Sequence, residues 1–425
     1  MPRARRAPLT CAMRVTIIAI GSLGDVAPYT GLGQGLAGRG HVVTIATHDR
    51  FRDLVASAGL RHFSLPMDPR AELTPSHAAK ISGNSIGSMR ALEALYRPWV
   101  PRLATAIDDA AADADVLLLS ALAWIGFHVG QGRGITTIGL PLQPFEPTSA
   151  FGPPALGRAS WGGPLNRALG RAVARQMVAP WIDTVNEIRA RHGLASITVR
   201  EHFAALAAHH FRVLHGYSPS VLPRPRDWRP EIEVVGYWWP AVPTNWTAPA
   251  NLVDFLATGR PPIYVGFGST VPGSLDRLDH AVREALKATG QRAIVQKGWA
   301  GLSAAGEDVY VIEDVPHSWL FPQLACAVHH AGAGTTAAAL RAGIPAVTVP
   351  VSVDQPFWAR RLHDLGAAPP PIPAKKLTGA RLTAALARIS SDPSYTNRAR
   401  TLSQRLNAED ATARVAAAIG LTREQ

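Results

Sequence analysis

The sequence predicts an α/β protein built from two doubly wound units, and three observations support this prediction. The chain has 425 residues, which is more than one hydrophobic core usually serves. Apolar strand-like runs alternate with alanine- and leucine-rich helical stretches along both halves, and a proline-rich stretch separates the halves. Near-continuous apolar strands divided by helices are typical of parallel sheets that are buried on both faces.

The individual elements are predicted from these runs. Strand candidates of the first half are 13–20, 41–47, 115–122 and 136–142, and those of the second half are 262–269, 292–297, 309–314, 325–330 and 345–350. Helical stretches between them include 28–39, 273–289 and 335–342, and residues 379–421 are alanine-rich and helical in character.

Residues 222–260 are predicted to connect the two domains, because their proline density cannot continue a helix or a central strand. We therefore expect a first domain over 13–221, a second domain over 261–400 and a C-terminal segment over 401–425. Residues 1–12 are expected to be a disordered extension rather than a signal peptide, because the apolar run that follows is too short.

Composition narrows the function classes. The net charge is +12, but the chain has no run of five like charges and no aromatic residues interleaved with its arginines, so nucleic-acid binding is not expected. Contact between a basic face and an acidic membrane surface stays open. Two cysteines, Cys11 and Cys326, cannot form a disulfide framework, which favours the reducing cytoplasm. No apolar run reaches the ~18 residues of a membrane span, and a monomer or a homodimer is expected.

The stretch GSLGDVAP (21–28) follows the first predicted strand. In an open parallel sheet, ligands bind beyond the carboxyl ends of the strands. Gly21 and Gly24 allow close backbone approach, and Asp25 is the ionisable side chain of the turn. The alternative interpretation makes Asp25 an ordinary partner of the helix N-terminus.

The stretch VHHAGAGTTA (328–337) indicates a diphosphate site. His330 ends a strand, Gly332 and Gly334 keep side chains away, and a helix beginning near Thr335 offers backbone N–H groups and a favourable dipole. The hydroxyls of Thr335 and Thr336 add hydrogen-bond donors.

A rival interpretation remains open at this point. The same glycines match the G-x-G-x-x-A fingerprint of NAD-dependent oxidoreductases, with Asp354 about 20 residues on. Three predicted strands precede the fingerprint, however, whereas it usually opens its domain, and paired histidines have no role in dinucleotide binding.

Other polar groups follow strands in the second half. Ser269 suits a phosphate or ribose contact, and Asp354 with Gln355 suits a ligand rich in hydroxyls. Val315 and His317 could face a base. The pair Asp113 and Asp115 precedes a strand instead of following one, and no cluster has convincing zinc spacing, so no metal site is expected.

Three stretches in this order resemble the inverting nucleotide-sugar glycosyltransferases of the GT-B type, and in particular the group of sterol glucosyltransferases and bacterial macrolide and glycopeptide glycosyltransferases. They are GSLGDVAP (21–28), VPHSWLFPQ (315–323) and the long stretch 329–378, which begins HHAGAGTTAAALRAGIP. The resemblance is faint across 70–230, where members of the group differ because this region meets the acceptor.

The resemblance implies two facing Rossmann-like domains with a cleft between them and a C-terminal helix that crosses back onto the first domain. It implies a metal-free transfer of a hexose from a UDP- or dTDP-sugar to a hydrophobic alcohol such as a sterol, a macrolide or a polyphenol, with no cofactor. A catalytically silent relative that acts as a binding partner is the other alternative.

By the same resemblance, each candidate residue has an expected role. Asp25 matches the general base. The diphosphate contacts are His330, Gly332, Gly334, Thr335, Thr336 and Ser269; the base contacts are Val315, His317 and Trp299; the donor-sugar contacts are Asp354 and Gln355. The acceptor pocket is expected to include Ser22, Trp99, Trp124, Phe127, His128 and Phe145, with Tyr96 and Trp161 as further aromatic candidates.

Two departures from the family pattern stand out. Ala331 replaces a glycine of the common HHGGAGT sequence, a change that we expect to be harmless. The chain reads VSVDQ (351–355) where sterol-type members often read PFFGDQ, which leaves the acceptor and the donor sugar open.

Overall fold

The computed structural model describes residues 12–72, 85–157, 160–268, 275–298, 301–302, 306 and 308–421. Apart from Ala12, the expected N-terminal extension lies outside these residues, and so does Cys11. Cys326 is buried and unpaired. None of the described helices combines the length and the apolar character that a membrane crossing needs.

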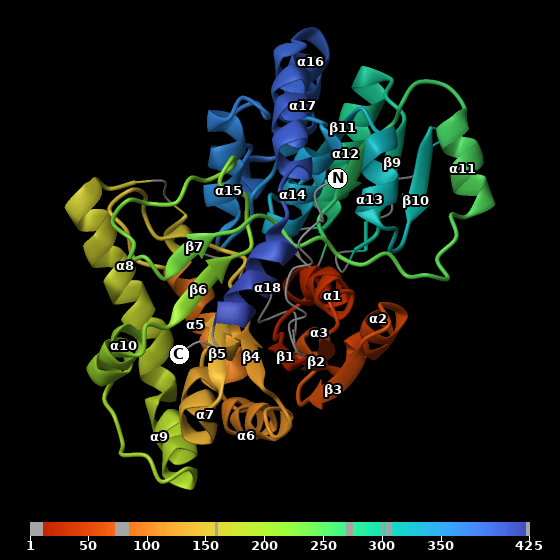
Figure 1. Cartoon of the computed structure of the whole chain (residues 1–425). Coiled ribbons are helices and arrows are strands. Elements are labelled where there is room, and N and C mark those ends of the chain that lie inside the picture. Colours follow the sequence, from red (N-terminus) through yellow and green to blue (C-terminus); the bar gives the residue numbers. More distant parts are fainter. Residues whose placement is uncertain are drawn as a thin grey trace, which may run out of the picture.

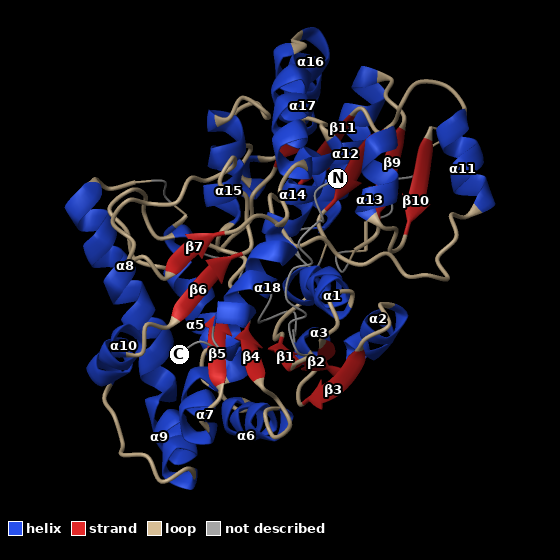
Figure 2. Ribbon diagram, in the orientation of Figure 1, coloured by secondary structure: helices blue, strands red, loops and turns tan. Residues whose placement is uncertain are grey.

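The first domain contains a parallel sheet with the strand order β3-β2-β1-β4-β5-β6-β7 (Figure 2). In that order the strands are Arg61–Leu65, Val42–His48, Arg14–Ile18, Val116–Leu119, Thr136–Gly139, Arg212–His215 and Ile232–Val234. The helices are α1 (Leu23–Ala37), α2 (Arg52–Ser57), α3 (Pro69–Glu72), α5 (Ser85–Tyr96), α6 (Val100–Ala110), α7 (Gly126–Arg133), α8 (Gly163–Val178), α9 (Ile182–Arg191) and α10 (Val199–Ala208).

The second domain contains a parallel sheet with the order β10-β9-β8-β11-β12. These strands are Val309–Ile312, Ala293–Gln296, Ile263–Gly266, Cys326–His329 and Ala346–Thr348. Its helices are α11 (Ala250–Ala257), α12 (Leu275–Thr289), α13 (His317–Leu320), α14 (Ala333–Ala342), α15 (Gln355–Asp364), α16 (Gly379–Ser391) and α17 (Ser394–Asn407), and the chain ends with α18 (Ala411–Leu421).

Both sheets form because short apolar runs are buried on both faces. Every residue is buried in β4, β8, β9 and β11, and so are the last two residues of β5. Such burial is expected for parallel strands that helices cover. The strand order reverses between β1 and β4 in the first sheet and between β8 and β11 in the second. These two switch points are where doubly wound sheets bind ligands.

The structure differs from the predicted element and domain ranges at three places. β7 lies inside the stretch predicted as the connection, because three residues suffice to pair with β6 at the sheet edge. The helix expected from residue 28 starts at Leu23 and carries Pro28 within it. In the C-terminal segment, α17 packs on α14, and it is α18 that lies against the first domain, from Ala411 onward.

The last helix of the chain, α18, returns from the second domain and packs against the first (Figure 1). Its buried residues belong to the hydrophobic core of the first domain and include Ala411, Val415, Ala418 and Ile419. A Cβ on Gly35 of α1 would lie 2.6 Å from the Thr412 methyl group, so α1 and α18 pack closely. The domains are therefore linked both by the connection after β7 and by α18.

Candidate active site

Asp25 lies in the first turn of α1, directly beyond β1 at the first switch point. Its Oδ2 accepts hydrogen bonds from the backbone N–H and the hydroxyl of Ser22, both at 2.9 Å. A Cβ added to Gly21 would lie 2.5 Å from this oxygen, and the φ of Gly21 is +137°, so the site requires glycine. Asp25 thus also serves the helix N-terminus, as the alternative interpretation expected.

The environment of Asp25 makes it a stronger base than a carboxylate in water. Burial raises its pKa, and the two hydrogen bonds from Ser22 offset part of that rise. Two tyrosines, Tyr29 and Tyr96, lie near enough that the charge of Asp25 raises their pKa values further, after burial has raised them. Tyr96 is therefore the aromatic candidate that the structure brings to the base.

Two polar side chains at neighbouring strand ends support this loop. His48 ends β2, and its Nε2 accepts a hydrogen bond from the Gly21 N–H at 3.3 Å. Burial lowers the pKa of His48, so the neutral ring is the form that accepts. The Ser120 hydroxyl, just after β4, accepts from the Ile20 N–H at 3.3 Å. Sequence analysis missed both residues, although each is a polar side chain at the carboxyl end of a strand beside the switch point.

The two histidines at the end of β11 have different environments: His329 is the last residue of the strand, and His330 follows it. His329 is fully buried, and its Nδ1 accepts a hydrogen bond from the Ala331 N–H at 3.0 Å. His330 is half-buried, and a Cβ on Gly332 would lie 2.4 Å from its Nε2. Burial lowers the pKa of His330 to about 4, so its ring is neutral and donates one N–H. His329 holds the loop, and His330 is the ring that can reach a ligand.

The helix α14 begins at Ala333 with Gly332 as its N-cap, two residues earlier than predicted, because alanine and glycine enter the first turn without strain. A Cβ on Gly334 would meet nothing within 4 Å, and Gly334 is exposed. Thr335 is half-buried, whereas Thr336 is 1% exposed. The first turn therefore offers backbone N–H groups, Gly334 and Thr335, while Thr336 points into the protein.

Two residues beside these loops have left-handed backbone without being glycine. They are Ala331, with a φ of +64°, and Val353, with a φ of +56°. This region costs an ordinary residue about 1 kcal/mol or more, and a β-branched residue is a genuine outlier there. The replacement of glycine by Ala331 is therefore not neutral for the backbone, contrary to our expectation, and strained backbone of this kind is concentrated at functional sites.

Asp354 caps α15, and its Oδ2 accepts a hydrogen bond from the Trp358 Nε1–H at 3.0 Å. Burial raises its pKa to about 6, and the charge of Asp25 adds to the rise. The neighbouring Gln355 is 8% exposed, and its Oε1 accepts from the N–H groups of Val351 and Ser352 at 2.9 and 3.2 Å. The amide oxygen of Gln355 thus holds its own loop, so the carboxyl of Asp354 is the more accessible group of the pair.

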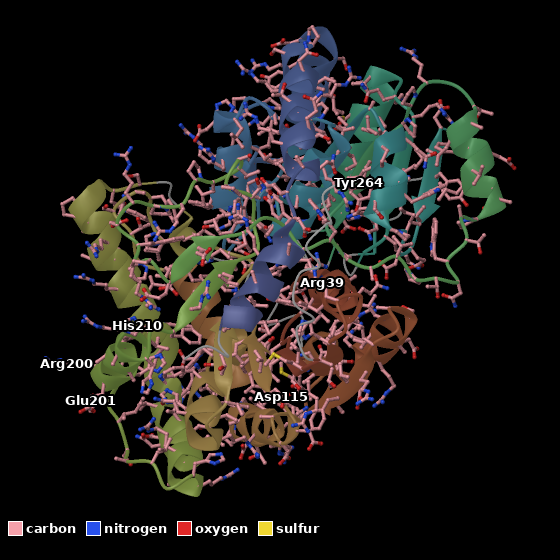
Figure 3. The ribbon with its side chains drawn as sticks, viewed as in Figure 1. Arg39, Asp115, Arg200, Glu201, His210 and Tyr264 are labelled. Atoms are coloured by element: carbon pink, nitrogen blue, oxygen red, sulfur yellow. The ribbon has the colours of Figure 1, made fainter. Side chains whose placement is uncertain are left out.

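The predicted base-binding segment opens α13. Val315 and His317 are half-buried, and the His317 ring stacks on Phe321 with centroids 4.3 Å apart. Tyr264, labelled in Figure 3, lies edge-on to His317 and donates its hydroxyl to Gln296 Oε1 at 2.5 Å. His317 is thus fixed by a buried polar network that the sequence did not indicate. Ser269 and Trp299 lie outside the described residues.

Most aromatic candidates for the acceptor pocket are core residues instead. Phe127 is 3% exposed and His128 is fully buried. The His128 Nε2 is 2.9 Å from His202 Nδ1, and Arg189 donates to His128 Nδ1 at 3.1 Å. Trp124 packs edge-on against His202 with centroids 5.1 Å apart. Phe127 belongs to the hydrophobic core that includes the β4 residues Leu117 and Leu119, and Trp99 and Trp124 are partly buried against this core.

Two predicted candidates lie elsewhere. Phe145 lines a cavity formed by the loop after β5 and by α8. Ser22 touches Asp25, as described. The pair Asp113 and Asp115 forms ion pairs with Arg14 at the amino end of β4, and Asp115 lies away from the second domain (Figure 3). Within the described ranges, His, Cys, Asp and Glu side chains form no group of three that could hold a metal.

The two switch points belong to one site. The helices α1 and α14, which begin at these switch points, are in contact, and the charge of Asp25 in the first domain contributes to the raised pKa of Asp354 in the second. One face of this site offers a raised-pKa carboxylate, and the other offers a neutral imidazole, a helix N-terminus and a second carboxyl group. This arrangement suits proton removal opposite a charged leaving group.

Comparison with known proteins identifies this architecture. Residues 15–129 match the glycosyltransferase family 28 N-terminal domain, and residues 282–420 match the C-terminal domain of erythromycin biosynthesis protein CIII-like proteins. The chain is 34% identical over 407 residues to O-mycaminosyltylonolide 6-deoxyallosyltransferase of Streptomyces fradiae, covering 93% of this chain and 94% of that protein. The chain belongs to the same glycosyltransferase family as this relative.

The chain is also similar to sterol glucosyltransferases that are longer than it is. It is 32% identical over 421 residues to sterol 3-beta-glucosyltransferase UGT80A2 of Arabidopsis thaliana, covering 94% of this chain and 64% of that protein. The chain thus spans less than two thirds of this relative, and it spans 27% of a Cryptococcus neoformans sterol 3-beta-glucosyltransferase.

Solved structures confirm the fold of the chain. The glycosyltransferase of kitacinnamycin is 21% identical, with a TM-score of 0.71 over 96% of this chain and 99% of that chain. CalG4, the calicheamicin glycosyltransferase, is 18% identical, with a TM-score of 0.68 over 97% and 99%. The prediction of an α/β protein with two Rossmann-like GT-B domains is confirmed, and family membership does not favour the oxidoreductase.

Proposed function

We propose that the protein is an inverting glycosyltransferase that moves a hexose from a UDP- or dTDP-sugar to a hydroxyl group of a hydrophobic acceptor. The observation that carries the proposal is the placement of Asp25 in the first domain within electrostatic reach of Asp354 in the second. The relatives that act on sterols and on a macrolide lactone, by their names, support a hydrophobic natural product as acceptor.

The donor would bind mainly to the second domain. Its diphosphate would lie at the first turn of α14, where the N–H groups and the dipole favour negative charge. The exposed Gly334 leaves room for phosphate oxygens, and the His330 imidazole is close to donate a hydrogen bond. Asp354 would accept hydrogen bonds from hydroxyls of the sugar.

The chemical step would be a single displacement at the anomeric carbon. The acceptor oxygen forms the new bond as the bond to the nucleoside diphosphate breaks, and the acceptor proton passes to Asp25. Even with a raised pKa, this carboxylate is too weak to ionise an alcohol beforehand, so the proton moves late. General-base catalysis of this kind contributes about 10²–10⁴-fold.

The leaving diphosphate gains negative charge as its bond breaks. The helix N-terminus and His330 provide fixed dipoles at that place, and stabilisation by such preorganised groups is often the largest catalytic term. We therefore propose that transfer needs no metal ion and no cofactor, and that it takes place in the cytoplasm, where a buried free thiol such as that of Cys326 stays reduced.

A panel of nucleotides tests the proposal. UDP or dTDP should raise the unfolding temperature more than GDP or NAD, and the preferred nucleotide sugar should then yield a hexose-shifted product by mass spectrometry with a mixture of hydrophobic alcohols. Stabilisation by NAD alone, or the absence of any product with all sugars and acceptors, would contradict it.

A further inference from the structure

The indole of Trp358 lies next to the carboxyl group that the proposed function assigns to the donor sugar. Trp358 is 1% exposed, and its Nε1–H donates to Asp354 Oδ2 at 3.0 Å. The backbone joins the same two residues, because the Trp358 N–H donates to the Asp354 carbonyl at 3.1 Å in the first turn of α15. Asp354 itself is half-buried. Its carboxyl group can therefore meet a ligand, whereas the indole is enclosed by the protein.

This hydrogen bond distinguishes Trp358 from tryptophans that only fill the core. Nε1 of Trp228 and Nε1 of Trp238 are also buried, but neither atom has a hydrogen-bond partner among the described residues. Trp228 belongs to the same hydrophobic cluster as Trp358. A hydrogen bond to a charged acceptor is stronger than one between neutral groups, so the Trp358 N–H favours the carboxylate form of Asp354 and fixes its orientation.

The loop before α15 is held from a second direction. The Oε1 atom of Gln355 accepts hydrogen bonds from two backbone N–H groups of this loop, and Val353 within it has a φ of +56°. A β-branched residue keeps this conformation only where the surrounding structure enforces it. Gln355 therefore fixes the backbone of the loop, and Trp358 fixes the carboxyl group that the loop presents.

The first domain in turn holds Trp358. The ring of Tyr217, two residues after β6, packs edge-on against the Trp358 ring with centroids 5.8 Å apart, a separation typical of aromatic pairs. One residue earlier on α15, the Phe357 ring packs on Phe151 of the first domain with centroids 5.4 Å apart. All four residues belong to one hydrophobic cluster that crosses between the domains. The first domain thus determines where the indole lies and, through it, where the Asp354 carboxyl group points.

We propose that Trp358 is a positioning residue for the donor sugar, which holds the Asp354 carboxylate ready to accept a hydrogen bond from a sugar hydroxyl, and that Tyr217 of the first domain keeps Trp358 in place. This inference rests on the proposed function and deepens it, because recognition of the sugar then depends on both domains. With Oδ2 of Asp354 bound to the indole, the sugar hydroxyl donates to Oδ1. The diphosphate binds at α14, so the affinity for the nucleotide alone does not depend on this pair.

The test compares UDP with UDP-glucose, or dTDP with dTDP-glucose if dTDP is the nucleotide that stabilises the wild type. Calorimetric affinities are measured for the wild type, for Trp358→Phe, which keeps an aromatic ring but loses the N–H, and for Trp228→Phe as the matched control in the same cluster. Trp358→Phe should bind the sugar nucleotide about tenfold or more weakly, as expected for the loss of a hydrogen bond to a charged group. It should bind the nucleotide as the wild type does, and the control should retain both affinities.

Carboxyl-carbon NMR without nucleotide gives a readout that packing alone would not move. Burial raises the pKa of Asp354 to about 6, the charge of Asp25 adds to the rise, and the hydrogen bond from Trp358 opposes it. The Asp354 midpoint should therefore increase in Trp358→Phe, because a hydrogen bond to the charged form is lost. The midpoint should stay at its wild-type value in Trp228→Phe.

Tyr217 supplies a second pair of variants. Tyr217→Leu removes the ring that packs on Trp358, so it should weaken binding of the sugar nucleotide and leave binding of the nucleotide unchanged. Tyr217→Phe removes a hydroxyl that has no hydrogen-bond partner among the described residues, and it should retain both affinities.

An unchanged affinity for the sugar nucleotide together with an unmoved midpoint in a folded Trp358→Phe would overturn the inference. An equal loss for the nucleotide and the sugar nucleotide in both tryptophan variants would overturn it as well, because both changes would then act through packing. A wild type that binds neither nucleotide nor either sugar nucleotide would contradict the proposed function. The NMR midpoint, which needs no nucleotide, would in that case still decide whether Trp358 holds Asp354.

Discussion

The carboxyl groups of Asp25 and Asp354 come from different domains, yet the charge of Asp25 contributes to a pKa of about 6 at Asp354, after the larger effect of burial. This relationship joins the two halves of the site. It also makes the protonation of Asp354 depend on a residue more than three hundred positions away in the chain.

Replacing Asp25 should therefore change the titration of Asp354. In Asp25→Asn the repulsion is gone, so the Asp354 midpoint should move below its wild-type value of about 6, although burial keeps it above the usual carboxyl pKa. Carboxyl-carbon NMR across pH 4–8 measures the shift. Asp183→Asn, which removes an exposed acid on α9, should leave the midpoint in place, and an unmoved midpoint in Asp25→Asn would show that the two groups do not interact.

A pair of glycines tests the geometry of the Asp25 loop. Gly21→Ala should destabilise the fold by more than about 1 kcal/mol, because its Cβ would lie 2.5 Å from Asp25 Oδ2 and its φ is positive. Gly24→Ala is the matched control, since its Cβ would lie 3.9 Å from Ser22 Oγ, an ordinary van der Waals distance. In the first turn of α1 it should be neutral or stabilise by up to about 1 kcal/mol. Urea unfolding decides the matter, and equal effects of both changes would refute the geometry.

The first turn of α14 offers a second pair. Gly332→Ala should displace the His330 ring, because the new Cβ would lie 2.4 Å from His330 Nε2. Gly334→Ala meets no protein atom within 4 Å, so it should preserve or raise stability while its methyl group occupies the space proposed for the diphosphate. Both variants should lose about tenfold or more in nucleotide affinity by calorimetry. Unchanged affinity in Gly334→Ala would remove the diphosphate from this turn.

Several of these features were predictable from the sequence. The strands β1, β4, β8 and β11 are mostly apolar runs, and the Asp25 and His330 loops directly follow β1 and β11. β3, β6 and β7 were missed because they are short and carry polar residues. β3 and β7 are also the edge strands of their sheet, and only one of the five residues of β3 is buried.

The remaining features depend on contacts between distant parts of the chain. The support of the Asp25 loop by His48, the link from Tyr264 to Gln296 and the placement of His128 in the core all arise only once the strands and helices have packed. The left-handed backbone of Ala331 and Val353 could not be predicted from the sequence either, because alanine and valine do not favour this conformation.

Buried histidines predict sensitivity to acid. Burial lowers the pKa values of His128, His215 and His329 to about 3 and that of His202 to about 4. Their stabilising contribution is complete above the unfolded pKa of about 6.5 and is lost as pH falls toward the folded values. Between pH 7 and pH 5 each should cost about 2 kcal/mol of unfolding free energy. Urea unfolding at both pH values measures the loss, and equal stability at pH 7 and pH 5 would contradict the neutral, buried state of these rings.

The most direct test of the account separates the base from the nucleotide site. Asp25→Asn is assayed by single-turnover sugar transfer and, in parallel, by calorimetric binding of the nucleotide that stabilises the wild type. The account predicts a loss of at least about 10²-fold in transfer with an unchanged dissociation constant for the nucleotide. Full transfer by this variant, or a nucleotide affinity that falls as far as the transfer rate, would contradict the assignment of proton removal to the first domain and of the diphosphate to the second.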